Sequence, residues 1–112
     1  MIYTNPEIAV VGETEESASA KGINFKKIKT PMQYSGKYVI ENENADGIIK
    51  IISNSDNKKI IGIHMIGNGS SEIIYGAGMM VKQGMKIDDA KSIIFPHPTV
   101  SEIIGEAISK IL

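Results

Sequence analysis

Short apolar runs, most of them alternating or rich in β-branched residues, occupy the first two-thirds of the chain and predict β-strands. Gly, Pro, Asn and Asp residues bound these runs, as is typical of strands joined by tight connections. The segments predicted as strands are residues 8–11, 25–30, 33–41, 47–53 and 59–66. Residues 54–57, Asn-Ser-Asp-Asn, favour a turn, so we expect the last two segments to form an antiparallel hairpin.

The apolar period changes to that of an α-helix after residue 69. One stripe comprises Ile73, Ile74, Ala77, Met80 and Val81. Gly84 is placed to end that helix, and a shorter helix is expected to begin at Asp88 and to end before residue 95. The last helix has the most regular stripe, formed by Val100, Ile103, Ile104, Ala107, Ile108 and Ile111. Near the N-terminus, Thr14 can cap a helix that runs to about Lys21 and stops at Gly22.

The order of these elements, strands first and helices after them, indicates the fold class. It predicts an α+β fold with a mostly antiparallel sheet that helices cover on one side. The 112 residues suit a single compact domain, residues 1–112. A domain of this size can bury roughly two-thirds of its unfolded surface. The 42% of apolar and 22% of charged residues are ordinary for a globular protein.

The charge balance and the lack of cysteine exclude several functions. Twelve basic and thirteen acidic residues give a net charge of −1, and no basic stripe indicates a nucleic-acid interface. The lysines at 26, 27 and 29 are typical of a solvated face. Without cysteine the chain itself carries no disulfide, thiol nucleophile or thiolate ligand, and we predict no metal site. No apolar run approaches the ~18 residues of a membrane span. Glutamates at 13, 15 and 16 interrupt any signal-like core, so we expect no membrane contact and a cytoplasmic location.

Residues 67–72, Gly-Asn-Gly-Ser-Ser-Glu, follow a predicted strand and open a predicted helix, which is the setting of a dinucleotide-binding loop. The third glycine is missing, and Glu72 would place a carboxylate where a pyrophosphate should bind. We therefore interpret this run as a turn and helix cap. In the helix that follows, Gly76 and Gly78 each cost up to about 1 kcal/mol relative to alanine. Close packing against another element or subunit would account for them.

Two other residue types are interpreted as structural. His64 lies in an apolar strand, where a single histidine is usually a hydrogen-bonded structural residue. The six methionines, including Met79 and Met80, are expected to fill the core, because the flexible methionine side chain adapts to irregular gaps.

Candidate chemistry is concentrated in residues 95–102, where two prolines flank His97 and Glu102 follows five residues later. A histidine titrates near neutral pH, and a carboxylate partner can orient it and stabilise its charged form. The prolines restrict the backbone on both sides of the imidazole. The same residues also fit a purely structural role, with Thr99 as N-cap and Glu102 at the third helical position of a capping box. The residues alone leave both interpretations open.

Residues 97–102, His-Pro-Thr-Val-Ser-Glu, resemble the C-terminal signature of the pyridine nucleotide-disulfide oxidoreductases. Residues 3–12 are similar to the segment that opens the same domain in that family. Residues 61–67, followed by Ser71-Glu72, are similar to its central strand and turn. The three segments occur in the family's order and span essentially the whole chain. The resemblance implies a C-terminal dimerisation domain, excised from a longer flavoprotein.

Within the family, residues 103–107 look more like the dihydrolipoamide dehydrogenases than the glutathione reductases. Phe95 departs from that pattern, because the lipoamide enzymes often carry a second histidine there. The resemblance implies that His97 is a general base that reaches the partner subunit's active site and deprotonates dihydrolipoamide, and that Glu102 orients it. The family's FAD-binding and NAD-binding domains and its redox-active cysteines are absent from these residues. FAD and NAD are therefore expected only in the full-length enzyme.

The resemblance also implies partners. These are a second copy of the subunit, the missing FAD and NAD domains, and the dihydrolipoyl groups of a carrier protein in a 2-oxo acid dehydrogenase or glycine cleavage complex. We expect the chain alone to fold but not to oxidise dihydrolipoamide. Two alternatives stay open, a glutathione-reductase-like domain and a self-associating module without catalytic function.

Overall fold

The computed structural model describes residues 8–31, 47–67, 70–92 and 102–110. In these residues the strands are β1 (Ile8–Gly12), β2 (Phe25–Pro31), β3 (Ile48–Asn54) and β4 (Ile60–Ile66). The helices are α1 (Glu15–Ala20), α3 (Ser70–Lys82), α4 (Ile87–Lys91) and α5 (Glu102–Ser109). Each element has the type that the sequence predicts. The predicted strand over residues 33–41 lies outside the described residues.

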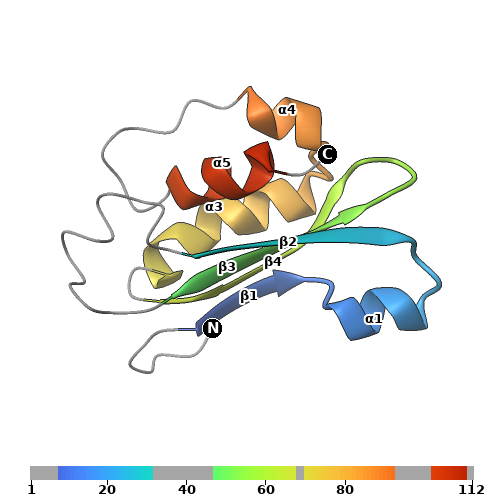
Figure 1. Ribbon diagram of the computed structural model, residues 1–112, viewed down its shortest axis with the longest axis horizontal. Helices are drawn as coiled ribbons and strands as arrows, with labels where there is room; N and C mark the ends of the chain where they lie inside the picture. The colour runs from blue at the N-terminus through green and yellow to red at the C-terminus, as the bar shows by residue number, and fades with distance from the viewer. Residues whose placement is uncertain (1–7, 32–46, 68–69, 93–101, 111–112) are drawn as a thin grey trace.

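The four strands form one antiparallel sheet in the order β1-β4-β3-β2 (Figure 1). The predicted hairpin of β3 and β4 occupies its centre. In the turn, the Asn54 side-chain oxygen accepts hydrogen bonds from the backbone N–H groups of Asp56 at 2.8 Å and Asn57 at 3.3 Å. Lys58 then adopts a left-handed backbone with φ of 66°. The turn is therefore specified locally, because an asparagine side chain mimics a backbone acceptor.

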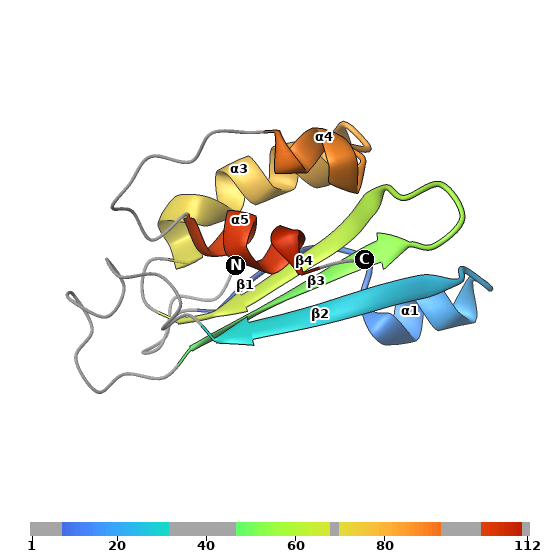
Figure 2. The same cartoon turned by 45° about the horizontal axis from the view of Figure 1, so that its top comes forward.

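The helices lie mainly on one face of the sheet, as predicted. Figures 1 and 2 show α3, α4 and α5 together on that face and α1 on the other. α3 packs on β1 and β4, α5 packs on β2 and β3, and α4 packs on α5. We call the face under α3 and α5 the inner face and the opposite one the outer face.

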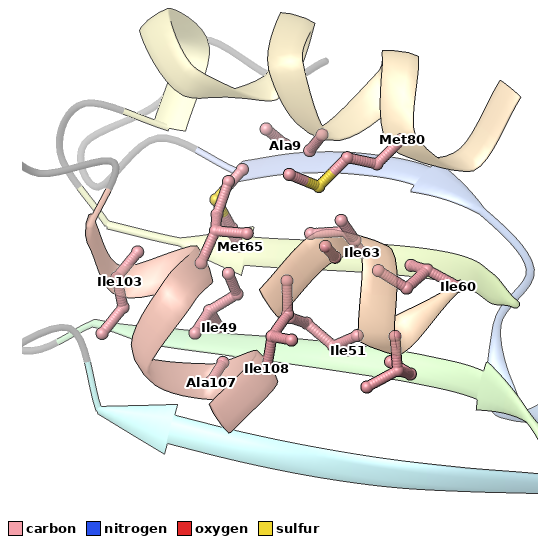
Figure 3. Packing of buried hydrophobic residues seen from close by; sticks show 14 residues of the cluster. Ala9, Ile49, Ile51, Ile60, Ile63, Met65, Met80, Ile103, Ala107 and Ile108 are labelled. Carbon is pink, nitrogen blue, oxygen red and sulfur yellow. The ribbon is translucent and has the colours of Figure 1, made fainter. Parts of the chain in front are cut away.

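The core lies between the inner face and the helices (Figure 3). Its fully buried strand residues are Ala9, Ile49, Ile51, Ile60, Ile63 and Met65. Ala77 and Met80 contribute from α3, and Ile103, Ala107 and Ile108 from α5. Burying each isoleucine side chain stabilises the fold by roughly 1.5–3 kcal/mol. The ladder is irregular beside Ile52 and Ser53, which pair with Gly62 and Ile60 respectively. The extra residue on β4 is a β-bulge, and it lets Ile60 and Ile63 both join the core.

α1 begins and ends where the sequence predicts. The Thr14 hydroxyl accepts a hydrogen bond from the Ser17 N–H at 3.0 Å, and the Ser17 hydroxyl accepts one from the Thr14 N–H at 2.8 Å. This reciprocal capping box satisfies two backbone donors at the helix start. Gly22 follows the helix with φ of 71°, a conformation that favours glycine.

The other helices differ from prediction only at their ends. α4 begins at Ile87 rather than Asp88, with Lys86 as an N-cap whose side chain makes no capping hydrogen bond. Ile87 is buried, so tertiary packing rather than a polar cap sets this boundary. Gly84 follows α3 with φ of 64°, as expected for a helix stop. Among the described residues, no helix is long and apolar enough to span a membrane.

Candidate subunit interface and the predicted acid-base pair

The predicted acid-base pair is only partly within the described structure. His97 lies outside the described residues, and Glu102 enters as the first residue of α5, without a description of its side chain. α5 itself is firmly seated, since Ile103, Ala107 and Ile108 are fully buried. The predicted apolar stripe is confirmed for its described members. The start of α5 is thus held against the sheet, and the roles of His97 and Glu102 stay predictions.

The residues of α3 that point away from the sheet form the most exposed apolar surface among the described helices. Ala77 and Met80 face the core, whereas Tyr75 is 77% exposed and Met79 is 49% exposed. A shallow hollow on this side is lined by Tyr75, Gly78, Met79, Lys82 and Gln83. We call Tyr75, Met79 and Gln83 the α3 outer surface. Exposed apolar side chains grouped in this way mark interaction sites.

The prediction that all methionines fill the core is wrong for Met79. Met65 and Met80 are in the core and Met85 packs partly against it, but Met79 lies on the α3 outer surface. Adjacent helical residues lie about 100° apart around the axis, and the phase of α3 turns Met80 toward the sheet and Met79 away from it.

The glycines of α3 have different surroundings. A Cβ atom added to Gly78 would meet the Val11 side chain at 3.8 Å, an ordinary contact. A Cβ atom added to Gly76 would meet nothing within 4 Å, so no neighbour in the described part of the chain requires glycine there. Close packing of another described element on Gly76 is therefore not observed. A second subunit remains the predicted neighbour.

The turn before α3 is held by Ser70. Its hydroxyl donates a hydrogen bond to the Gly67 carbonyl oxygen at 2.7 Å, and the side chain is buried. Asn68 and Gly69 lie outside the described residues. Every strand pair in the described sheet is antiparallel, so β4 and α3 do not belong to the βαβ unit that a dinucleotide-binding loop requires.

His64 is a structural residue, as predicted. It lies on the outer face and its Nε2 atom donates a hydrogen bond to the Glu13 carbonyl oxygen at 2.8 Å. The Glu13 N–H donates in turn to the Ile61 carbonyl oxygen at 2.8 Å. A Cβ atom on Gly62 would lie 2.1 Å from that Glu13 oxygen, so only glycine permits this close crossing of the backbone over β4. These contacts fix the start of α1 on the outer face.

Ion pairs also tie α1 to the outer face. Glu15 contacts Lys27 of β2 at 2.6 Å and Lys50 of β3 at 3.1 Å. The hydrogen bond from Lys27, and then that from Lys50, lower the pKa of the Glu15 carboxyl from its ordinary value of 4.5 to about 2. Lys27, a member of the lysine cluster, is therefore paired rather than only solvated. Among the described residues, no group of three histidine, aspartate or glutamate side chains is placed to hold a metal ion.

Comparison with known proteins assigns the class. The sequence profile of the pyridine nucleotide-disulphide oxidoreductase dimerisation domain matches residues 1–108. This chain therefore belongs to that family of dimerisation domains. The resemblance found in the sequence is confirmed, and a domain of this family implies a homodimer.

Individual relatives show which enzymes of this family the chain is similar to. Dihydrolipoyl dehydrogenase of Bacillus subtilis is 42% identical over 106 residues, which are 95% of this chain and 22% of that protein. The mitochondrial dihydrolipoyl dehydrogenase of Pisum sativum is 34% identical over 96% of this chain and 21% of its own length. Leghemoglobin reductase of Glycine max is 33% identical over 96% of this chain and 20% of its own length. The chain thus spans about a fifth of the length of these relatives.

Solved structures confirm the fold. The flavoprotein disulfide reductase RclA of Escherichia coli has a TM-score of 0.89 at 23% identity, over 98% of this chain and 25% of that chain. LpdA of Mycobacterium tuberculosis has a TM-score of 0.88 at 23% identity, over 98% of this chain and 24% of that chain. The α+β architecture is therefore that of the dimerisation domain in flavoprotein reductases.

Proposed function

We propose that this chain is the dimerisation domain of an enzyme that oxidises dihydrolipoamide. The observation that carries this proposal is the 42% identity, over 95% of the chain, to a dihydrolipoyl dehydrogenase. The substrate in this proposal is the dihydrolipoyl group of a carrier protein in a 2-oxo acid dehydrogenase or glycine cleavage complex. Because the chain spans about a fifth of its relatives' length, the activity belongs to a longer subunit.

His97 is the general base in this proposal. A thiol is a poor nucleophile until it loses its proton. An imidazole accepts that proton near neutral pH, and the dihydrolipoamide thiolate so formed attacks the enzyme's disulfide. Glu102 orients the imidazole. Its backbone begins α5, where the positive end of the helix dipole favours an ionised carboxylate.

FAD and NAD, which enzymes of this family use, supply the redox chemistry in the longer subunit. The described residues do not fit either dinucleotide, since the sheet is antiparallel and the Gly67 turn leads into no parallel strand. Both cofactors would be held by other domains, and the isolated 112-residue chain should have no lipoamide oxidation activity. NAD-dependent turnover of dihydrolipoamide by the purified chain would contradict this.

The second copy of the subunit binds, in this proposal, at the α3 outer surface. Tyr75 and Met79 are exposed there on a helix that is otherwise anchored in the core. Aromatic and methionine side chains are enriched in subunit contacts. Gly76 lies between them with open space around its Cα, so a neighbouring backbone could approach closely.

A His97→Gln variant of the full-length enzyme tests the catalytic proposal. Reduction of the enzyme by dihydrolipoamide in stopped flow should slow by about 10²–10⁴-fold, the usual contribution of a general base. Reduction of the same enzyme by NADH is the matched control. It should keep its rate, because no substrate thiol has to be deprotonated when electrons come from NADH. An unchanged rate with dihydrolipoamide would exclude His97 as the base.

A further inference from the structure

The outer face of the sheet has an apolar area that no described element covers. Cross-strand register places Ile8, Ile66 and Ile48 in one row, and Val10, His64 and Lys50 in the next. Side chains of directly paired residues point to the same face. Val10 is 52% exposed, Ile66 is 42% exposed and Ile48 is 36% exposed. We call Val10, Ile48 and Ile66 the open sheet patch.

The open sheet patch contrasts with the other end of the same face. Ile52 lies on β3 four residues beyond Ile48, so both side chains point to the outer face. Ile52 is fully buried, and so is Ala18 of α1, although neither belongs to the core under α3 and α5. α1 thus shields one end of the outer face and stops before the other, as Figure 1 shows. Among the described residues, the patch is the part of this face where large apolar side chains stay exposed.

The polar residues beside the patch, which include Glu15, Lys50 and His64, form its polar border, and interactions within the domain hold them in place. The patch and this border line a shallow hollow of about 380 Å³. Lys50 is held by Glu15 at 3.1 Å, and their side chains are only 25% and 28% exposed. His64 is fixed by its hydrogen bond to the Glu13 carbonyl oxygen. A prearranged border around apolar residues loses little side-chain entropy when a partner binds.

The course of the chain favours one occupant over the others. β1 begins at Ile8, in the row that contains Ile48 and Ile66. The start of β1 therefore lies beside the patch, on the side from which an upstream domain would be joined. In the Bacillus subtilis relative, nearly four-fifths of the chain has no counterpart here. The α3 outer surface, which we assign to the second copy, lies on the opposite side of the sheet (Figure 2).

We propose that the open sheet patch seats another domain of the same subunit, which packs an apolar surface on Val10, Ile48 and Ile66. This inference rests on the proposed function, because it requires the longer subunit. It adds that the domain uses opposite sides for two partners. The outer face receives the rest of its own subunit, and the helical face receives the second copy.

Single introduced cysteines test the inference, because the 112-residue chain has none of its own. V10C reports on the patch, Y75C on the α3 outer surface, and D56C on the exposed hairpin turn as the matched control. Maleimide labelling of each site is followed by mass spectrometry of its peptide, in the 112-residue chain and in the full-length enzyme. We expect the V10C thiol to label about tenfold or more slowly in the full-length enzyme, because burial blocks access to the thiolate. D56C should label equally fast in both.

Cross-linking identifies which polypeptide covers the open sheet patch. Full-length dimers are prepared from isotope-labelled and unlabelled subunits, and a thiol-to-amine cross-linker is attached at V10C. Cross-links from V10C to the rest of the enzyme should stay within one isotopic form. Links between forms, or slower V10C labelling of the 112-residue chain as its concentration rises, would assign the patch to the second copy and overturn the inference.

Three further outcomes relate this inference to the proposed function. Equal V10C labelling in the short and full-length proteins, with lipoamide oxidation intact, overturns the inference alone. A native coding sequence without any upstream domain overturns both. Loss of dihydrolipoamide activity in the His97→Gln enzyme, together with V10C protection, supports both.

Discussion

Both faces of the sheet carry isoleucine, but the isoleucines of the two faces have different environments. On the inner face Ile49 and Ile51 are fully buried under α5, whereas on the outer face Ile48 of the same strand is 36% exposed. All three residues are isoleucine, so their side chains do not explain the difference in exposure. The inner face therefore buries its isoleucines within the described domain. In our proposal the exposed end of the outer face packs against the rest of the subunit.

The largest effect should come from truncating the inner face. Ile51→Ala should lower the free energy of unfolding by about 2–5 kcal/mol, because it leaves a cavity in a core with no exposed surface. Ile48→Ala, the matched control on the same strand, should cost less than about 1 kcal/mol, since its side chain is already partly in water. Urea unfolding of both variants at one protein concentration provides the comparison. Equal losses would mean that the two faces do not differ energetically.

The glycine at the α1 crossing should be the next most sensitive position. Gly62→Ala should lower the free energy of unfolding by about 1–3 kcal/mol, because its Cβ atom would lie 2.1 Å from the Glu13 carbonyl oxygen. Gly76→Ala has open space instead and should raise it by up to about 1 kcal/mol through helix propensity. Thermal unfolding at concentrations where the chain is monomeric would test both. A neutral Gly62→Ala would show that the outer-face crossing can relax.

Replacing one polar residue on the inner face by an apolar one should stabilise the fold. Thr30 is fully buried on β2, and its hydroxyl has no hydrogen-bond partner among the described residues. Thr30→Val keeps the shape and removes the unsatisfied group, so the free energy of unfolding should rise by about 1 kcal/mol. Thr30→Ser keeps the hydroxyl and should show no gain. Stabilisation by the serine variant would contradict this explanation.

The smallest effect should be the pH dependence of the pairs on the outer face. The pKa of Glu15 is about 2 in the folded chain, below its ordinary value of 4.5. Its contribution to stability is therefore present above pH 4.5 and is lost as the pH falls toward 2. Glu15→Gln should flatten the fall in unfolding free energy over this range, modestly because the pairs are partly exposed. Glu16→Gln, from the same helical turn, controls for the loss of one carboxylate. If it flattens the pH dependence equally, the ion pairs of Glu15 are not the cause.

Much of the fold was predictable because its signals are local. The Thr14–Ser17 capping box and the Asn54 turn involve residues two or three positions apart, so the sequence displays them directly. The start of α4 was not predictable in this way. It depends on the burial of Ile87, and no residue near Ile87 in the sequence indicates that burial.

The candidate interface was less predictable than the fold. Gly76 and Gly78 drew attention to α3, but the sequence did not indicate that Met79 would be exposed and Met80 buried. The phase of a helix relative to the sheet decides this, and the phase is a tertiary property. His97 and Glu102 were selected by motif, and their arrangement stays a prediction.

By itself the sequence determined the elements, their order and the family, because periodicity, caps and motifs are carried by residues close together in the chain. Only the tertiary structure decided which apolar residues are covered. Ile48 and Ile52 have the same residue type, strand and face, yet one is exposed and the other is buried. The physical reason is that burial depends on which distant element comes to lie on a surface, and α1 lies at only one end of the outer face (Figure 1).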